Sequence, residues 1–187
     1  MSDIKRIRRR QILSEAEGYL DLLLVFADRW PPSPQRRDHL ASRALNILEA
    51  LRDTTEDYAY VHYLRGQALR VMERFAEAVV PLKEASDHDP ANIHIWLALG
   101  WCYKRIGRLD LAVESLESAI DFDPDEAILH YNLACYWSLA GNEKLAIEYL
   151  SNALDIDPDY RDMVAGEHDF DPIRNNPNFQ ALTSVIV

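Results

Sequence analysis

The sequence predicts an all-α protein made of repeated pairs of helices. Shifting the chain against itself by 34 residues aligns three Asp-Pro pairs, which end at Pro90, Pro124 and Pro158. The same shift aligns further columns of small and large apolar residues, namely Ala78, Ala112 and Ala146; Leu82, Leu116 and Leu150; and Ala85, Ala119 and Ala153. A period of this length is typical of stacked helix-turn-helix repeats, in which each repeat buries its apolar face against its neighbours.

Length and composition favour one continuous fold over residues 1–187. At this size roughly 70% of the surface of the unfolded chain is buried on folding. With 48% hydrophobic residues, the core therefore needs no disulfide or metal. The two cysteines, Cys102 and Cys135, lack the spacing of a disulfide or zinc motif, and no leader-like segment precedes the repeats, which predicts a reducing, cytoplasmic location. The longest apolar run, residues 22–27, is far shorter than the roughly 20 residues that cross a bilayer.

Charge is distributed unevenly along the chain. The formal net charge is -11, which argues against general nucleic-acid binding because an acidic body is repelled by phosphates. Residues 1–10 are the exception, since they carry five basic side chains, Lys5, Arg6, Arg8, Arg9 and Arg10. This basic start leaves open a contact with nucleic acid or an anionic membrane, although a solvated helix end explains it more simply.

The first repeat is predicted to be degenerate and to span residues 4–58. Its long first helix is expected over residues 4–29, with Gly18 as the glycine that allows close helix packing. A proline-rich break then separates it from a second helix over residues 37–52. An atypical repeat is expected at the end of an array, where it covers the core.

The central repeats resemble a known family. Residues 93–126 contain Trp96, Leu99, Gly100, Tyr103, Ala112 and Pro124 at the positions of the tetratricopeptide pattern, with Leu116 where the family has Phe. Residues 59–92 and 127–160 match more loosely. The resemblance implies a right-handed α-solenoid of about four repeats, closed by C-terminal capping helices.

Small residues and glycines have distinct roles in this pattern. Gly66, Gly100 and Ala134 share a column in which a small residue lets paired helices approach closely. Gly107 and Gly141 lie between the two helices of their repeats, where they are expected to end the first helix.

Residues 161–187 are predicted to form the C-terminal cap, a name kept below. Residues 169–179 resemble the segment that closes many bacterial repeat arrays. Asn176 followed by Pro177 is a typical helix start, and Phe179, Leu182 and Ile186 recur on one face that is expected to cover the last repeat.

No catalytic or cofactor motif occurs in the chain. A Gly-rich phosphate loop, a Gly-x-Ser-x-Gly elbow and a His-Glu-x-x-His motif are all missing from the sequence. His62 and His130 share the column of Trp96, which predicts packing and not metal ligation. We therefore expect no enzyme, no cofactor, no metal and no small-molecule substrate.

The family resemblance assigns a binding role to the first helix of each repeat, because these helices line the concave groove. The candidate groove residues are Tyr60, Tyr63, Gln67, Arg70, His94, Leu97, Trp101, Lys104, Arg105, Ile128, Tyr131 and Asn132. Aromatic residues concentrate binding energy, and the basic residues favour an acidic or carboxylate-bearing partner. Other tetratricopeptide domains bind the C-terminal carboxylate of chaperones through a clamp of Lys, Asn and Arg residues. Of the residues in the corresponding columns here, only Asn132 matches, so a chaperone C-terminus is not expected as the ligand.

The predicted function is a non-enzymatic scaffold or adaptor that holds a peptide or protein segment in the groove. One alternative is a dedicated chaperone for one partner, as in bacterial secretion. The other is contact with nucleic acid or membrane through the basic N-terminus. The sequence leaves the oligomeric state and the identity of the partner open.

Overall fold

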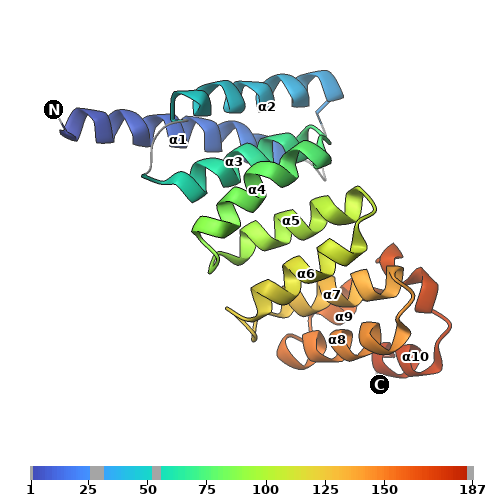
Figure 1. Cartoon of the computed structure of the whole chain (residues 1–187). Coiled ribbons are helices and arrows are strands. Elements are labelled where there is room, and N and C mark those ends of the chain that lie inside the picture. The colour runs from blue at the N-terminus through green and yellow to red at the C-terminus, as the bar shows by residue number, and fades with distance from the viewer. Residues whose placement is uncertain (1, 26–31, 52–55, 185–187) are drawn as a thin grey trace. The chain divides into compact units, whose positions relative to one another are not determined.

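The computed structural model describes residues 2–25, 32–51 and 56–184, and every regular element in these ranges is a helix (Figure 1). This confirms the predicted all-α fold. The chain divides into two compact units, an N-terminal unit of residues 1–102 and a C-terminal unit of residues 103–187. Helix α5 (Ile93–Arg105) contains the boundary. The predicted single domain over residues 1–187 stays a prediction.

The N-terminal unit begins with two helix pairs. Helix α1 (Ser2–Val25) packs against α2 (Pro34–Leu48), which continues into a short 3-10 helix, η1 (Glu49–Leu51). Helix α3 (Tyr58–Val71) packs against α4 (Phe75–His88) and also contacts α1 and α2. Their shared core consists of Leu13, Ala16, Leu20, Leu23, Ala41, Ala44, Leu48, Leu51, Val61, Leu64 and Ala68.

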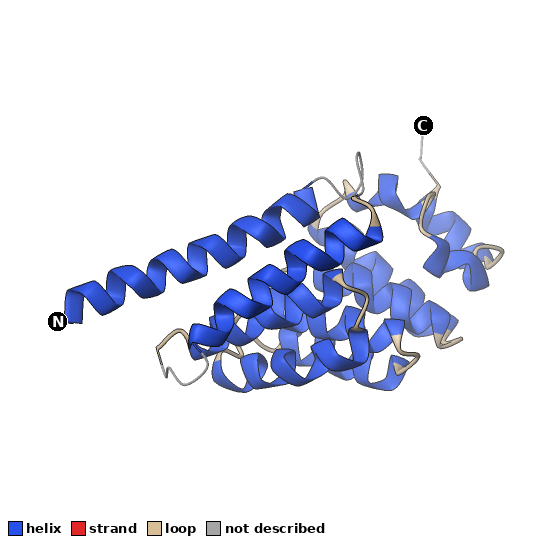
Figure 2. Ribbon diagram, turned by 90° about the horizontal axis from the view of Figure 1, so that it is seen from above, coloured by secondary structure: helices blue, strands red, loops and turns tan. Residues whose placement is uncertain are grey.

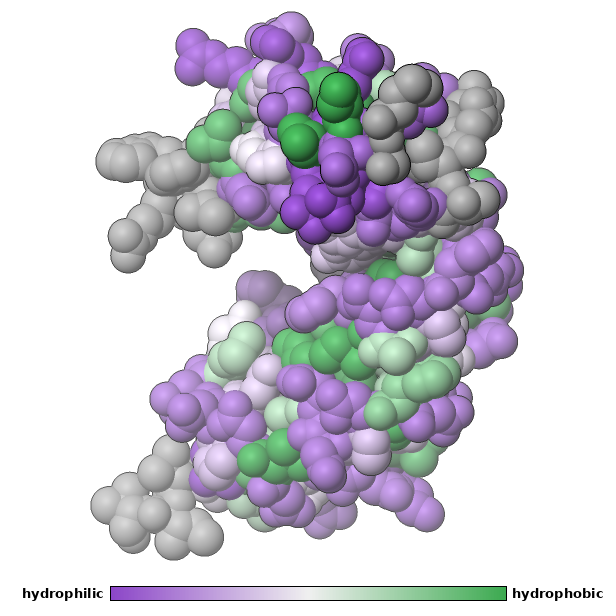
Figure 3. Space-filling model, turned by 90° about the vertical axis from the view of Figure 1, so that its left-hand side faces the viewer, coloured by the Kyte–Doolittle hydropathy of each residue, from purple (hydrophilic) through white to green (hydrophobic). Residues whose placement is uncertain are grey.

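The first half of α1 extends past the end of α2 (Figures 1 and 2). Its fully buried side chains begin at Leu13. Before that residue, Ile12 packs against the core and Arg9 forms ion pairs with Glu56 and Asp57. Ile4 and Ile7 are 73% and 55% exposed. Figure 3 looks from the side on which the N-terminus lies, and its upper part shows strongly hydrophilic residues next to hydrophobic ones.

The structure confirms one close-packing glycine and corrects another. A Cβ at Gly66 would lie 2.4 Å from Leu82 Cγ, so only glycine allows α3 to approach α4 this closely. The expectation for Gly18 was wrong, because a Cβ there would meet nothing within 4 Å. Gly18 lies on the exposed face of α1, and the buried Ala16 provides the small residue of this helix.

The C-terminal unit contains the remaining repeat helices. Helix α7 (Ala127–Leu139) packs between α6 (Leu109–Ile120) and α8 (Glu143–Ile156). The Asn142 side chain accepts a hydrogen bond from the backbone N–H of Leu145 and so caps the start of α8.

The described part of the C-terminal cap consists of three short helices. They are the end of α9 (Tyr160–Val164), the 3-10 helix η2 (His168–Ile173) and α10 (Pro177–Thr183). Asn176 caps α10 by accepting from the N–H groups of Asn178 and Phe179, as its sequence predicts. Helix α10 packs against α8, with Phe179 buried and Leu182 partly buried; Ile186 lies outside the described residues.

Successive repeats are joined by a recurring hydrogen bond. The indole Nε1 of Trp96 donates to the carbonyl oxygen of Pro90 over 2.8 Å. One repeat later, Nε2 of His130 lies 2.7 Å from the carbonyl oxygen of Pro124, to which the Nε2–H tautomer donates. His130 therefore replaces the tryptophan as a structural donor.

The turn between the two helices of each repeat uses a left-handed residue. Gly107 and Gly141 have φ values of +76° and +78°, as expected for glycines that end a helix. Glu73 occupies the same column of the preceding repeat and has a φ of 60°. That conformation costs a residue with a Cβ roughly 1–2 kcal/mol.

Helix α1 is the longest described helix, with 24 residues. Neither it nor any other helix in the described ranges combines the length and the apolar character that crossing a membrane requires.

Candidate functional site

Arg70 is the centre of the candidate site in the N-terminal unit. It lies near the end of α3, with its guanidinium carbon 5.2 Å from the centre of the Trp101 ring on α5. Its Nε donates to Oε1 of Gln67 over 2.7 Å, which explains why Gln67 is buried at only 6% exposure. Phe75 meets Trp101 edge-on, with ring centres 5.0 Å apart. Arg70 and Trp101 are therefore held in a fixed arrangement.

These two side chains line a surface hollow of 290 Å³. It is defined here as the Arg70 hollow, and its lining residues are Leu23, Leu24, Pro32, Arg37, Arg70, Val71, Glu73 and Trp101. Its rim contains one ion pair, in which Arg37 Nη1 lies 2.5 Å from Glu73 Oε1. The hollow thus combines an apolar wall with the guanidinium of Arg70.

Arg70 has no carboxylate partner among the residues that the structure describes. Burial lowers the pKa of its guanidinium from the usual value, yet an arginine stays charged at neutral pH. A partly buried cation has lost much of its hydration, which makes it a favourable position for a ligand carboxylate.

The corresponding side chain of the C-terminal unit is already paired. Lys104 forms an ion pair with Asp169 of η2, and the two side chains are 23% and 16% exposed. The Lys104 ammonium also lies 5.9 Å from the centre of the Tyr136 ring. Next to Asp169, Phe170 is fully buried and meets Tyr131 edge-on at 5.6 Å between ring centres. Tyr131 is 3% exposed, so it offers no surface to a partner.

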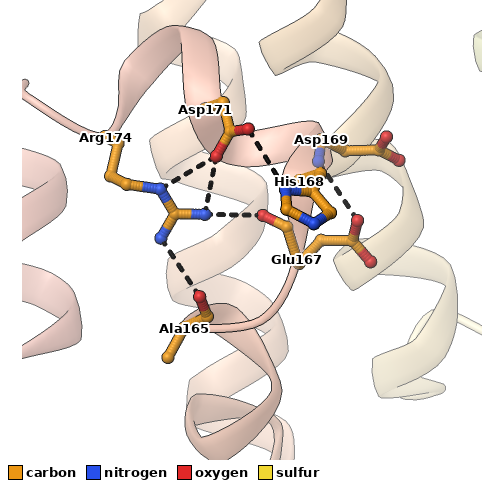
Figure 4. A network of polar contacts seen from close by, with 6 residues as sticks. All are labelled: Ala165, Glu167, His168, Asp169, Asp171 and Arg174. Atoms are coloured by element: carbon orange, nitrogen blue, oxygen red, sulfur yellow. Dashed lines mark hydrogen bonds and ion pairs between the residues drawn. The ribbon is translucent and has the colours of Figure 1, made fainter.

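The C-terminal cap is held in this place by its own polar network (Figure 4). Arg174 donates to Oδ1 of Asp171 over 3.0 Å and to the carbonyl oxygen of Glu167 over 2.8 Å. The Glu167 carboxylate accepts from the backbone N–H of Asp169 over 3.1 Å. These bonds fix the backbone of η2 where it packs against α7.

One group of side chains in the C-terminal unit has the composition of a metal site. The ligand atoms of Cys135, Glu167 and Asp169 lie within 4.8 Å of one another. Burial raises the pKa of the Cys135 thiol, and the two nearby carboxylates raise it further. Lys104 already neutralises the Asp169 carboxylate, and the Cys135 thiol stays protonated. These three side chains are therefore better suited to the ion pair with Lys104 than to binding a metal cation.

Other predicted groove residues are used inside the molecule. The Tyr60 hydroxyl donates to Glu17 of α1, and Tyr60 stacks on Tyr63 with ring centres 6.3 Å apart. Both tyrosines pack against the core of the N-terminal unit. The Asn132 side chain donates to the carbonyl oxygen of Ile128 over 2.8 Å.

The remaining predicted residues lie at or near the surface. His94 and Arg105 are exposed, and Leu97 is partly buried. The structure therefore brings Gln67, Arg70 and Trp101 together in one site and leaves His94 and Arg105 outside its lining. Sequence reasoning missed Leu23 and Leu24 of α1, because nothing in the 34-residue pattern shows where a degenerate first helix lies.

A larger hollow of 820 Å³ lies over α2, α3 and α4. Its charged groups are paired with one another. Glu84 is 2.8 Å from the Tyr58 hydroxyl and 3.0 Å from Nδ1 of His62, and Arg65 is 2.5 Å from Glu49. Because these charges are already satisfied, this hollow is a weaker candidate for a charged ligand than the smaller Arg70 hollow.

The helix pairs, the glycine turns and the recurring Trp96 and His130 bonds define an α-helical repeat protein. Sequence models of the tetratricopeptide repeat match residues 69–134 and 127–160. Residues 69–160 are therefore tetratricopeptide repeats, which makes the chain a tetratricopeptide repeat protein over this range.

Solved structures support the same fold. A crystal structure of MamA has a TM-score of 0.61 and 19% identity, and the match covers 84% of this chain and 88% of that one. A structure of MamA residues 41 to the end from Desulfovibrio magneticus RS-1 has a TM-score of 0.58 and 19% identity, and the match covers 83% of this chain and 93% of that one. YrrB is described as a tetratricopeptide protein with an unusual peptide-binding site. Its structure has a TM-score of 0.56 and 22% identity, and the match covers 79% of this chain and 71% of that one. No curated protein sequence matches the chain.

Proposed function

We propose that this chain is a non-enzymatic interaction scaffold that holds a segment of another protein in the Arg70 hollow. The observation that carries the proposal is the guanidinium of Arg70, which is partly buried over Trp101 and has no carboxylate partner among the described residues. The repeats, in this view, form one interaction domain whose helices position this site.

The energetics favour a ligand that carries a negative charge. Charge-assisted hydrogen bonds are about twice as strong as neutral ones, and an arginine presents two parallel donors to a carboxylate. The Arg70 guanidinium has lost hydration without gaining an ion pair to any described residue, so a ligand carboxylate would add an interaction to those that the structure describes. The ring of Trp101 lies beneath the guanidinium, with the guanidinium carbon 5.2 Å from its centre.

The apolar wall provides the second part of the interaction. Leu24 is 41% exposed at this surface, and Val71 and Trp101 are partly buried. Tryptophan and arginine are among the residues on which binding energy concentrates, at about 2 kcal/mol or more for each such anchor. YrrB, which shares the fold, is described as a peptide-binding protein, and this supports the proposal.

A displayed peptide library tests the proposed function. The full chain is expected to select peptides whose binding is lost in Arg70→Gln and in Trp101→Ala. Arg108→Gln is a matched control, because Arg108 is exposed and its ion-pair partner among the described residues is the local Asp110. Far-ultraviolet circular dichroism and urea denaturation establish that each variant is folded. Peptides that bind the Arg70 and Trp101 variants as well as the wild type would contradict the proposal.

The exposed start of α1 supports a second candidate function. Arg8 and Arg10 are exposed beside Ile4 and Ile7, which gives this helix end both basic and apolar surface. Such a helix end suits an anionic membrane surface. Vesicles with anionic lipid should then bind the full chain and release it as salt rises. Equal binding by a protein that lacks residues 1–10 would exclude this role.

A further inference from the structure

Each of the two compact units contains a basic side chain at the same column of the repeat. In one unit it is paired with a carboxylate, and in the other no described residue provides one. Arg70 and Lys104 occupy the same column of the 34-residue repeat, and so do Trp101 and Cys135. Each basic side chain lies over an aromatic ring of the next first helix, Arg70 over Trp101 and Lys104 over Tyr136. The two positions therefore have comparable chemistry.

In the C-terminal unit this position is filled by the chain itself. Asp169 pairs with Lys104 and lies beside Cys135, and the next residue, Phe170, inserts against Tyr131. An acidic residue and the aromatic residue that follows it thus occupy the basic position and the adjoining apolar position. Both side chains come from η2, which packs on α7.

We propose that the Arg70 hollow binds a segment of a partner protein in which an acidic residue is followed directly by an aromatic one. One repeat later, Asp169 and Phe170 give an example of such a pair held beside a basic side chain, with Asp169 on Lys104. The column of Tyr131 corresponds to Leu97, which lies outside the Arg70 hollow, so the apolar wall of this hollow comes instead from α1 and α3. This inference rests on the proposed function and names the class of its ligand.

Size and charge fit this ligand. Apolar cavities of about 150 Å³ bind benzene, so a hollow of 290 Å³ has room for a phenyl ring beside a carboxylate. The carboxylate would meet Arg70 next to Trp101, as Asp169 meets Lys104 next to Cys135. The ring would meet the apolar wall of Leu23, Leu24 and Val71.

A second copy of the chain is a less suitable occupant through its Asp169 and Phe170. These residues are already engaged with Lys104 and Tyr131 of its own C-terminal unit, and the Arg174 network holds the segment in place. Exchange between copies would first break these contacts. A partner with a free acidic-aromatic pair has no such cost. The exposed pair Asp121 and Phe122 is another acidic-aromatic pair that a second copy could offer, and sedimentation tests that occupant directly.

A labelled synthetic peptide with the sequence of residues 165–175 of this chain is the direct probe, with fluorescence anisotropy at low salt as the measurement. Wild-type protein should bind it. Asp169→Asn or Phe170→Ala within the peptide, or Arg70→Gln in the protein, should each weaken binding about tenfold or more, which corresponds to the loss of one charge-assisted or aromatic anchor. Arg108→Gln should leave the affinity unchanged.

Two further measurements decide between the occupants. If the peptide instead replaces the protein's own cap, Lys104→Met will weaken binding and Arg70→Gln will not, which overturns the inference. Sedimentation that shows concentration-dependent dimers in the wild type but monomers in Arg70→Gln would identify a second copy as the occupant and also overturn it.

The peptide library separates this inference from the proposed function. Selected peptides that need Arg70 and contain an acidic-aromatic pair support both. Selected peptides that need Arg70 but lack such a pair overturn the inference and leave the proposed function standing. Absence of any peptide that needs Arg70 overturns both.

Discussion

The Arg70 hollow and the Lys104 position show how one repeat pattern yields an open hollow in one unit and a closed surface in the other. Both have a basic side chain over an aromatic ring. At Lys104, η2 supplies the carboxylate and the phenyl ring, so the interaction serves folding. At Arg70, no described residue supplies a carboxylate, so the same chemistry is available for binding.

The largest expected effect comes from removing the ring of the C-terminal cap. Phe170→Ala should lower the free energy of unfolding by about 3–5 kcal/mol, because the ring is fully buried between Tyr131 and Phe179. Urea denaturation measures the change. Phe122→Ala is the control, since Phe122 is 51% exposed and should change stability by less than about 0.5 kcal/mol. Equal effects of the two variants would contradict the burial of the cap.

The next largest effect is the difference in stability loss between variants at the two basic positions. Asp169→Asn should cost about 1.5–3 kcal/mol, because it leaves the partly buried Lys104 without its counter-ion. Arg70→Gln removes no ion pair with a described residue and should cost less, about 1 kcal/mol, from the lost ring contact and the lost hydrogen bond to Gln67. Thermal and urea unfolding of both variants check the difference. A larger loss for Arg70→Gln would show that Arg70 has a structural partner.

Smaller changes in stability are expected from substitutions at the turns of the repeats. Glu73→Gly should raise the stability by about 0.5 kcal/mol, because relief of the positive φ, worth about 1 kcal/mol, exceeds the loss of the exposed pair with Arg37. Gly107→Ala should instead lower the stability by about 1 kcal/mol. Urea denaturation of the two variants provides the measurement, and a loss of stability in Glu73→Gly would show that the pair with Arg37 dominates.

The smallest effect concerns the thiols beside the two positions. Burial raises the pKa of Cys102 to about 11, and nearby Arg70 opposes that rise. Burial and the carboxylates of Glu167 and Asp169 both raise the pKa of Cys135. With rising pH, Cys102 should therefore react with iodoacetamide before Cys135, as single-cysteine variants can establish. Arg70→Gln should delay the reaction of Cys102, and no such delay would contradict the placement of Arg70.

The same shift of the Cys102 pKa predicts how stability depends on pH. The folded thiol stays protonated while the unfolded thiol ionises near its ordinary pKa of 9.0. This contribution to stability is therefore complete below about pH 9 and is lost as the pH rises towards about 11. Urea denaturation across this range should show a smaller loss in Cys102→Ala than in the wild type.

Residue patterns along the chain determined the repeat fold. The 34-residue columns placed the helix pairs, Gly66 and the turns at Gly107 and Gly141, because each of these features depends on local geometry or on the neighbouring repeat. They also placed Arg70 and Trp101 on first helices, which is why both appear among the predicted groove residues.

Only the tertiary structure decided which predicted groove residues remain accessible. Tyr131 and Lys104 fit a binding groove by their columns, yet η2 covers the first and pairs with the second. Gly18 looked like a packing glycine, yet it faces open space. A column records the position of a residue within its own repeat. It contains no information about a non-repeating segment that folds back from elsewhere in the chain, and burial by that segment decides whether a side chain stabilises the fold or binds a partner.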